Sequence, residues 1–182
     1  TGNGLNELAH PQPMLTDIEF DVDGDMILAF ADRGAHQVGH FNLGPDPTDP
    51  RIFRNFSSGD ILRADFDGVN YLLENNGSSN GVTTTGVGNG QGPGGGEFYF
   101  DDDYFSNANN TGAGHEETAL GALAILPGTG EVVATLFDPI DQGTFNSAGT
   151  GRLSSSTGGN NGGRILYDSG IAVGTFAKGA GL

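Results

Sequence analysis

The chain repeats one pattern of apolar residues about 105 positions further along, and this repeat constrains its fold more than any other feature. Residues 10–20 match residues 115–125 in the initial histidine, in a leucine five residues later and in the alternating apolar positions that follow. Two further matches lie at nearly the same spacing, because residues 26–32 resemble 132–138 and residues 59–62 resemble 163–166. Two copies of a unit rich in alternating segments predict two similar β-structures.

Each copy has the strands and turns of two hairpins. In the first copy, alternation places Ile18 and Phe20 inward and Glu19 and Asp21 outward, before an Asp-Gly turn at residues 23–24. Asp-Gly favours a tight hairpin because glycine adopts positive φ without steric cost. The remaining segments follow the same plan, with strands at 61–66 and 69–73 in the first copy, strands at 164–168 and 171–176 in the second, and long polar loops at 33–59 and 139–163.

Four antiparallel strands per copy, arranged as two joined hairpins, are typical of a β-propeller blade. We therefore predict an all-β, propeller-like fold with two four-stranded blades and long loops. Blade 1 covers about residues 10–76, a Gly/Asn-rich connection about 77–114 and blade 2 about 115–182. A β-sandwich built from the same strands is the alternative.

The repeat predicts that Ile18 and Leu123 occupy equivalent buried strand positions, and that Ile61 and Ile165 do the same. The aligned histidines, His10 and His115, are interpreted as structural positions at the two blade entrances. Two blades cannot close a ring, since propellers need about four to eight. We therefore expect further blades of a longer chain, or neighbouring protomers, to complete the packing.

Composition excludes several classes of function. Seven Lys and Arg face 23 Asp and Glu, giving a formal net charge of −16 at pH 7. Binding to nucleic acid or to anionic lipid needs clustered positive charge, so neither is expected. The chain has no cysteine, which removes disulfides, thiolate zinc sites and cysteine nucleophiles. No apolar stretch is long enough for membrane insertion.

The most acidic segment, Asp101-Asp102-Asp103, is the candidate metal site. It follows an aromatic run at 98–100 and precedes Glu116, and no lysine or arginine lies near it in the sequence. Carboxylates are ligands that calcium prefers, so Asp101, Asp102, Asp103 and Glu116 form a candidate calcium site. The alternative interpretation is a solvated acidic loop.

Other motifs favour structural explanations. Asp21-Val-Asp-Gly-Asp25 has alternating carboxylates, but its glycine is at the wrong position for an EF-type calcium loop. The equivalent turn of the second copy, at 127–130, has no carboxylate. His115-Glu-Glu lacks the second histidine of a zinc-protease helix, because residue 119 is alanine. The glycine tract at 86–96 lacks the Gly-Lys-Ser/Thr of a phosphate loop. We assign no catalytic and no cofactor-binding residue.

Four segments carry a resemblance to a known group of proteins: residues 10–21, 90–100, 115–123 and 174–182. They resemble the propeller-like region of large bacterial secreted or cell-surface proteins that also carry SdrD B-like (serine-aspartate-repeat adhesin) domains. The resemblance covers most of the chain, although no SdrD B-like domain is present in it. It implies an extracellular or cell-surface location and a structural or adhesive role.

The expected function is thus that of a non-enzymatic structural or adhesive module, with calcium as the possible cofactor and with other surface proteins or glycans as possible partners. Two alternatives stay open. A metal-dependent, lactonase-like propeller enzyme would arrange hairpins such as residues 17–25 around an axial ion. A glycan-binding module is the other, although the chain has no tryptophan for stacking on sugars.

Overall fold

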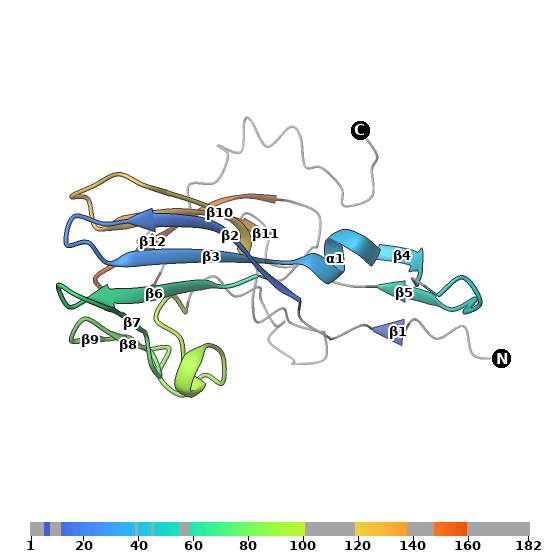
Figure 1. The fold of residues 1–182 in the computed structure, drawn as a ribbon, viewed down its shortest axis with the longest axis horizontal. Coiled ribbons are helices and arrows are strands. Elements are labelled where there is room, and N and C mark those ends of the chain that lie inside the picture. Colours follow the sequence, from blue (N-terminus) through green and yellow to red (C-terminus); the bar gives the residue numbers. More distant parts are fainter. Residues whose placement is uncertain are drawn as a thin grey trace.

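The computed structural model describes residues 6–7, 12–38, 40–44, 46–54, 59–100, 119–137 and 148–159. In these ranges the chain is all-β, apart from the six-residue helix α1 (Arg33–Val38) and the short 3-10 turn η1 (Pro93–Gly95) (Figure 1). The all-β prediction is confirmed. The strands form four separate, mainly antiparallel sheets, and none of the described sheets closes on itself.

The first large sheet has the strands that the sequence predicted for the first unit. Its order is β2 (Pro13–Phe20), β3 (Met26–Asp32), β6 (Ile61–Phe66) and β7 (Tyr71–Leu73), all antiparallel. The β2–β3 turn closes with a hydrogen bond from the Asp21 amide to the Asp25 carbonyl at 3.0 Å. The Asp-Gly turn therefore performs the hairpin role that the sequence assigned to it.

The second large sheet has the order β10 (Ala119–Ile125), β11 (Glu131–Phe137) and β12 (Ala148–Ser154). Strand β12 lies inside the segment predicted as a polar loop, 139–163, so that prediction is wrong there. Its glycine- and serine-rich sequence hides the strand, but β12 pairs with β11 at every position of its length. The strands predicted at 164–168 and 171–176, with Ile165, lie outside the described residues.

The two hairpins of the repeat have the same register. Cross-strand pair Ile18–Leu28 recurs as Leu123–Ala134, and Phe20–Met26 recurs as Ile125–Val132. The hydrogen-bond pattern agrees, since backbone groups of alternate residues in a strand point to opposite neighbours. In the middle strand of each copy, β3 or β11, the backbone groups of even-numbered residues point to the third strand, β6 or β12. The hydrogen bonds from Phe30 N to Asp60 O and from Ser155 N to Gly130 O show this. Leu28 therefore corresponds to Ala134.

The two sheets bury opposite faces of this shared hairpin. In the first sheet, Ile27, Ala29 and Ile61 face the core, whereas Ile18 is 42% exposed. In the second sheet it is Leu123, the equivalent of Ile18, that is buried, at 8% exposure. The predicted burial of Ile18 and the inward direction of Phe20 are thus wrong. Asp17, Glu19 and Asp21 share the core-facing side of β2 instead, and Asp17 Oδ2 accepts a hydrogen bond from Leu123 N at 2.8 Å.

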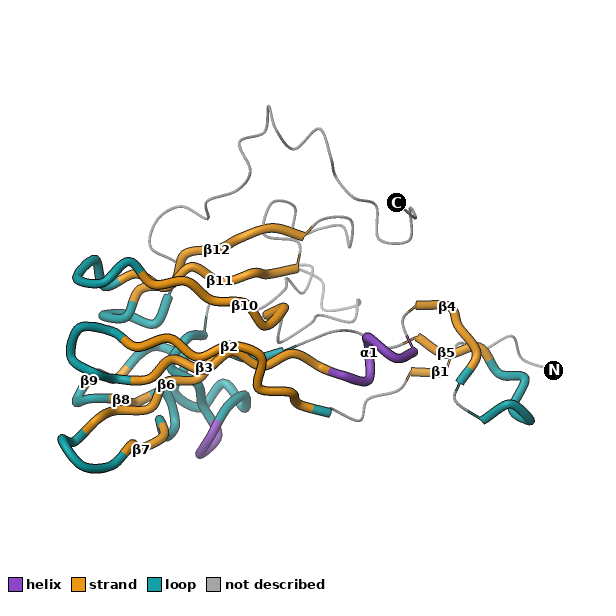
Figure 2. The backbone as a smooth tube through the Cα atoms, turned by 45° about the horizontal axis from the view of Figure 1, so that its top comes forward, coloured by secondary structure: helices purple, strands orange, loops and turns teal. Residues whose placement is uncertain are grey.

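The core lies where the second sheet packs on the first, with β10 against β2 and β3. Figure 2 shows β10, β11 and β12 beside the β2–β3–β6–β7 sheet. Equivalent residues of the two hairpins meet there, because Thr16 Oγ1 donates to Gly121 O at 2.6 Å. Phe98 and Tyr99, both fully buried, belong to the same core cluster.

Smaller elements fill the connections. The predicted polar loop at 33–59 contains α1, β4 (His40–Leu43) and β5 (Ile52–Arg54), so the loop prediction is wrong there as well. These two strands form a three-stranded sheet with β1 (Asn6–Glu7), in the order β1-β5-β4. The hairpin β8 (Ser78–Ser79) and β9 (Val82–Thr83) begins the Gly-rich connection. That connection packs backbone on backbone: a Cβ at Gly86 would lie 2.2 Å from the Glu97 carbonyl oxygen.

Candidate functional site

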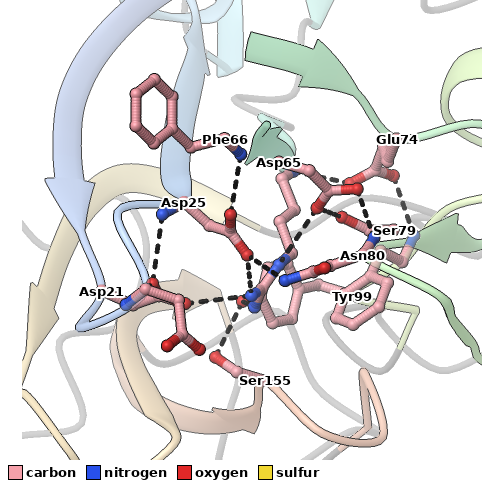
Figure 3. A network of polar contacts seen from close by, with 12 residues as sticks. Asp21, Asp25, Asp65, Phe66, Glu74, Ser79, Asn80, Tyr99 and Ser155 are labelled. Atoms are coloured by element: carbon pink, nitrogen blue, oxygen red, sulfur yellow. Dashed lines mark hydrogen bonds and ion pairs between the residues drawn. The ribbon is translucent and has the colours of Figure 1, made fainter. Parts of the chain in front are cut away.

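The most concentrated chemistry in the described residues is a buried polar network around Arg63 (Figure 3). Arg63 is on β6 opposite Ile27, so its side chain shares the core-facing side of the first sheet. It is only 5% exposed. Its guanidinium carbon lies 5.4 Å from the centre of the Phe98 ring, and Nη1 is 3.5 Å from the Tyr99 hydroxyl.

Two carboxylates of the β2–β3 turn hold this guanidinium. Arg63 Nη2 donates to Asp25 Oδ2 at 2.5 Å and to Asp21 Oδ2 at 3.0 Å. Asp25 is 1% exposed, and it also accepts hydrogen bonds from Phe66 N and Asn80 Nδ2. Burial opposes its charge, but the Phe66 N–H and the Arg63 guanidinium outweigh burial and hold the pKa of Asp25 below its ordinary value.

Asp65 attaches the β8–β9 hairpin to the network. Its Oδ1 accepts a hydrogen bond from the Ser79 hydroxyl and lies 3.7 Å from Arg63 Nε, and its Oδ2 accepts one from Asn80 N. Tyr99 extends the network to the second sheet, since its hydroxyl is 3.1 Å from Ser155 Oγ. The guanidinium thus contacts the β2–β3 turn, Asp65 and Tyr99 directly, and these partners connect it to the β8–β9 hairpin and to the second sheet.

A second buried carboxylate, Glu74, links β6 to the core aromatic residues. Glu74 is 2% exposed and accepts hydrogen bonds from Arg63 N at 2.6 Å and from Phe98 N at 2.8 Å. Burial raises the pKa of Glu74 to about 7, and the nearby carboxylates of Asp60 and Asp65 add to this rise. Burial also raises the pKa of Asp60 to about 6.

A pocket of about 260 Å³ adjoins the network between the hairpin turns of the two large sheets. Acidic and hydroxyl side chains form much of its wall, together with Arg63 and a few apolar residues; the polar lining residues include Asp21, Asp23, Ser79, Glu131, Ser155 and Ser156. Glu131 is engaged with Arg152 at 2.7 Å. Ser79 bonds Asp65, but none of the described residues lining this pocket is a histidine, so no Ser-His-Asp arrangement occurs there.

The chemistry of this site is that of a structural joint. Arg63 and the carboxylates around it contact one another and backbone N–H groups of the same chain. A buried guanidinium paired in this way fixes the relative positions of the strands that carry its partners.

The structure does not describe the metal site that the sequence predicted. Asp101, Asp102, Asp103 and Glu116, the candidate calcium ligands, lie outside the described residues, as do His10 and His115. In the ranges that the structure describes, no group of three or more His, Asp or Glu side chains is arranged to hold a metal ion. Likewise, no described helix has the length and apolar character needed to span a bilayer.

Comparisons with known proteins place the chain beside two very long proteins of Dictyostelium discoideum. It is 38% identical to colossin-B over 136 residues, which cover 70% of this chain and 3% of colossin-B. It is 28% identical to colossin-D over 166 residues, which cover 88% of this chain and 15% of colossin-D. No protein-family profile and no solved structure matches. Neither relative is bacterial, so the resemblance to bacterial SdrD-type surface proteins stays a prediction.

Proposed function

We propose that this chain is a non-enzymatic structural or adhesive module of an extracellular or cell-surface protein, in which β-units stack sheet upon sheet in a propeller-like way. The observation that carries the proposal is the direction of stacking. Two sheets related as the halves of a simple face-to-face sandwich would bury equivalent faces. Here the equivalents Ile18 and Leu123 are exposed and buried respectively, as expected when like units follow one another in one orientation.

Two further observations support a structural role. The Arg63 guanidinium pairs with carboxylates of the same chain, and Tyr99 bonds Ser155 of the second sheet. The polar network therefore holds the two sheets and the Gly-rich connection together. The chain also corresponds to a small part of two much longer relatives, as expected for one module among several. Calcium binding at Asp101, Asp102, Asp103 and Glu116 stays part of the proposal as an untested prediction.

The test uses the full-length protein in the cells that produce it. Surface labelling should detect this region on intact cells, and its deletion should weaken cell adhesion. The matched variant, Asp23→Asn with Ser156→Ala, changes the pocket wall but leaves the contacts of Arg63 with Asp21 and Asp25 intact. A structural module should keep adhesion in that variant. Loss of adhesion equal to the deletion would instead assign the function to a ligand or substrate of the pocket.

A further inference from the structure

The outer face of the first large sheet, defined as the side away from the second sheet, is apolar across all four strands. Cross-strand partners share a face, and the register places three rows there: Ile18–Leu28–Leu62, Phe20–Met26–Ala64–Leu73 and Phe66–Tyr71. Many of these side chains are 40% exposed or more, including Phe20, Leu73, Tyr71, Ile18 and Phe66. A contiguous exposed apolar surface of this kind marks a contact site.

Aromatic residues concentrate at one end of this outer face. The Tyr71 ring lies 5.1 Å from the Phe66 ring and 6.2 Å from the Phe20 ring, measured between centroids. No charged residue occurs in the three rows. In a chain with a net charge of −16, a sheet face without charge is a surface that a neighbour can cover without desolvating ions.

The internal repeat shows what covers such a face. The residues of the second sheet that correspond to this face, Leu123, Val132 and Ala134, are at most 8% exposed. They pack in one core cluster with Ile27, Ala29 and Ile61 of the first sheet. The partner for an outer face is therefore the opposite face of a like unit.

The molecule presents one such opposite face to the outside. On the second sheet, the positions that correspond to Ile27 and Ala29 are Val133 and Thr135, which are partly exposed. The positions that correspond to Asp17 and Glu19 are Ala122 and Ala124, which are exposed. Small side chains have replaced the two carboxylates, and Arg152 on this face is paired with Glu131 at 2.7 Å. We name this surface the free face.

We propose that the free face of one molecule packs on the outer face of a second copy of this chain, which extends the internal sheet stack from molecule to molecule. The contact is head-to-tail, because two different surfaces meet, and such contacts form open series unless the rotation closes a ring. The inference rests on the proposed structural role and names the partner of its stacking surface.

The experiment measures self-association of the 182-residue chain by sedimentation equilibrium over a wide range of concentrations. Wild type should form a concentration-dependent series beyond the dimer. Ile18→Glu on the outer face and Ala124→Glu on the free face should each weaken self-association by about a hundredfold, because each buries an unpaired charge. Val69→Glu adds the same charge at a turn residue that is 82% exposed, and should leave association unchanged.

Mixing the two variants gives the decisive result. Each variant keeps the surface that the other has lost, so an equimolar mixture should form a dimer and stop there. A dimer that Ala124→Glu does not weaken would show that two outer faces meet, and would overturn the head-to-tail contact. A wild-type monomer at every concentration would also overturn it, while leaving the adhesion test above unaffected. Thermal unfolding of each variant, with Ile18→Asn as a milder substitution, verifies that the fold is retained.

Discussion

Arg63 is the one cation in the described polar network, and it lies between Asp21, Asp25 and Asp65. Removing one partner of a buried ion pair leaves the other charge desolvated without compensation, which costs about 3–5 kcal/mol. We therefore expect Arg63→Ala to lower the free energy of unfolding by that amount, as measured by urea denaturation. Arg63→Lys should lose part of it, since lysine keeps the charge without the planar fork.

The matched control is Arg51, which pairs with Asp49 on the surface and is 60% exposed. Exposed pairs contribute little because water and salt screen them. Arg51→Ala should leave the unfolding midpoint within error of wild type. Equal losses for the two alanine variants would show that the network is not a structural joint.

Glu74 and Asp60 predict how stability depends on pH. Burial raises the pKa of Glu74 from 4.5 to about 7 and that of Asp60 from 3.8 to about 6. The native state therefore holds protons that the unfolded chain has released, so stability must fall as pH rises through this interval. Asp25 acts in the opposite sense: its pKa is lowered, so its contribution is lost only in stronger acid.

We expect the free energy of unfolding to decrease between about pH 5 and about pH 7.5, by on the order of 3 kcal/mol. Urea denaturation at a series of pH values measures this slope. Glu74→Gln cannot titrate, so it should flatten the slope as well as lower stability, because its amide accepts only one of the two backbone hydrogen bonds. A stability that rises through the same interval would contradict the assignment.

The Arg63 network was not predicted from the sequence, for a physical reason. Its ion pair joins positions 38 residues apart, and only the folded hairpin brings the Asp25 carboxylate to Arg63. The single signal was an arginine inside a strand of a chain that has seven Lys and Arg in total. The Asp21–Asp25 turn was interpreted correctly as turn chemistry, but its carboxylates also serve a long-range partner.

At the scale of elements, the junction of β2 and β10 depends on Gly121. The residue has φ +88°, and an added Cβ would lie 2.3 Å from Thr16 Oγ1 and 2.9 Å from the Ala31 Cβ. Gly128 has a similar φ of +84° but nothing within 4 Å of the added atom. In both alanine variants the positive φ lowers the free energy of unfolding by about 1–2 kcal/mol.

Gly121→Ala should be destabilised by about 1–3 kcal/mol more than Gly128→Ala, because only the first forces the two sheets apart. Thermal unfolding of the two variants side by side measures the difference. Equal midpoints would show that β2 and β10 do not approach as closely as the Thr16 hydrogen bond requires.

Strands were predictable where apolar alternation marks them and not where backbone pairing alone forms them. Residues 18–21 alternate before an Asp-Gly turn and an apolar run follows at 26–31, and strands β2 and β3 occur on the two sides of that turn. β12 has a single large apolar residue, Leu153, and gains its order from pairing with β11. No local pattern could mark such a strand.

At the scale of the whole molecule, the repeat predicted like units but not the faces they use. Alternation divides the residues of β2 into two sets without stating which set meets the core. The choice depends on which side the second sheet approaches, and this is a long-range property. Asp17 and Glu19 therefore lie on the core-facing side of β2, and the apolar set with Ile18 lies on the outer face.

Net charge sets the conditions under which copies of this chain can stack. Each molecule carries −16, so two copies repel, whereas the outer-face rows contain no charge and gain nothing from ion pairs. Salt shortens the Debye length from about 10 Å at about 0.1 M to about 3 Å at about 1 M, which screens the repulsion. Self-association should therefore strengthen several-fold over this range in sedimentation equilibrium. A contact built from ion pairs would weaken instead, and that outcome would contradict stacking through an apolar sheet face.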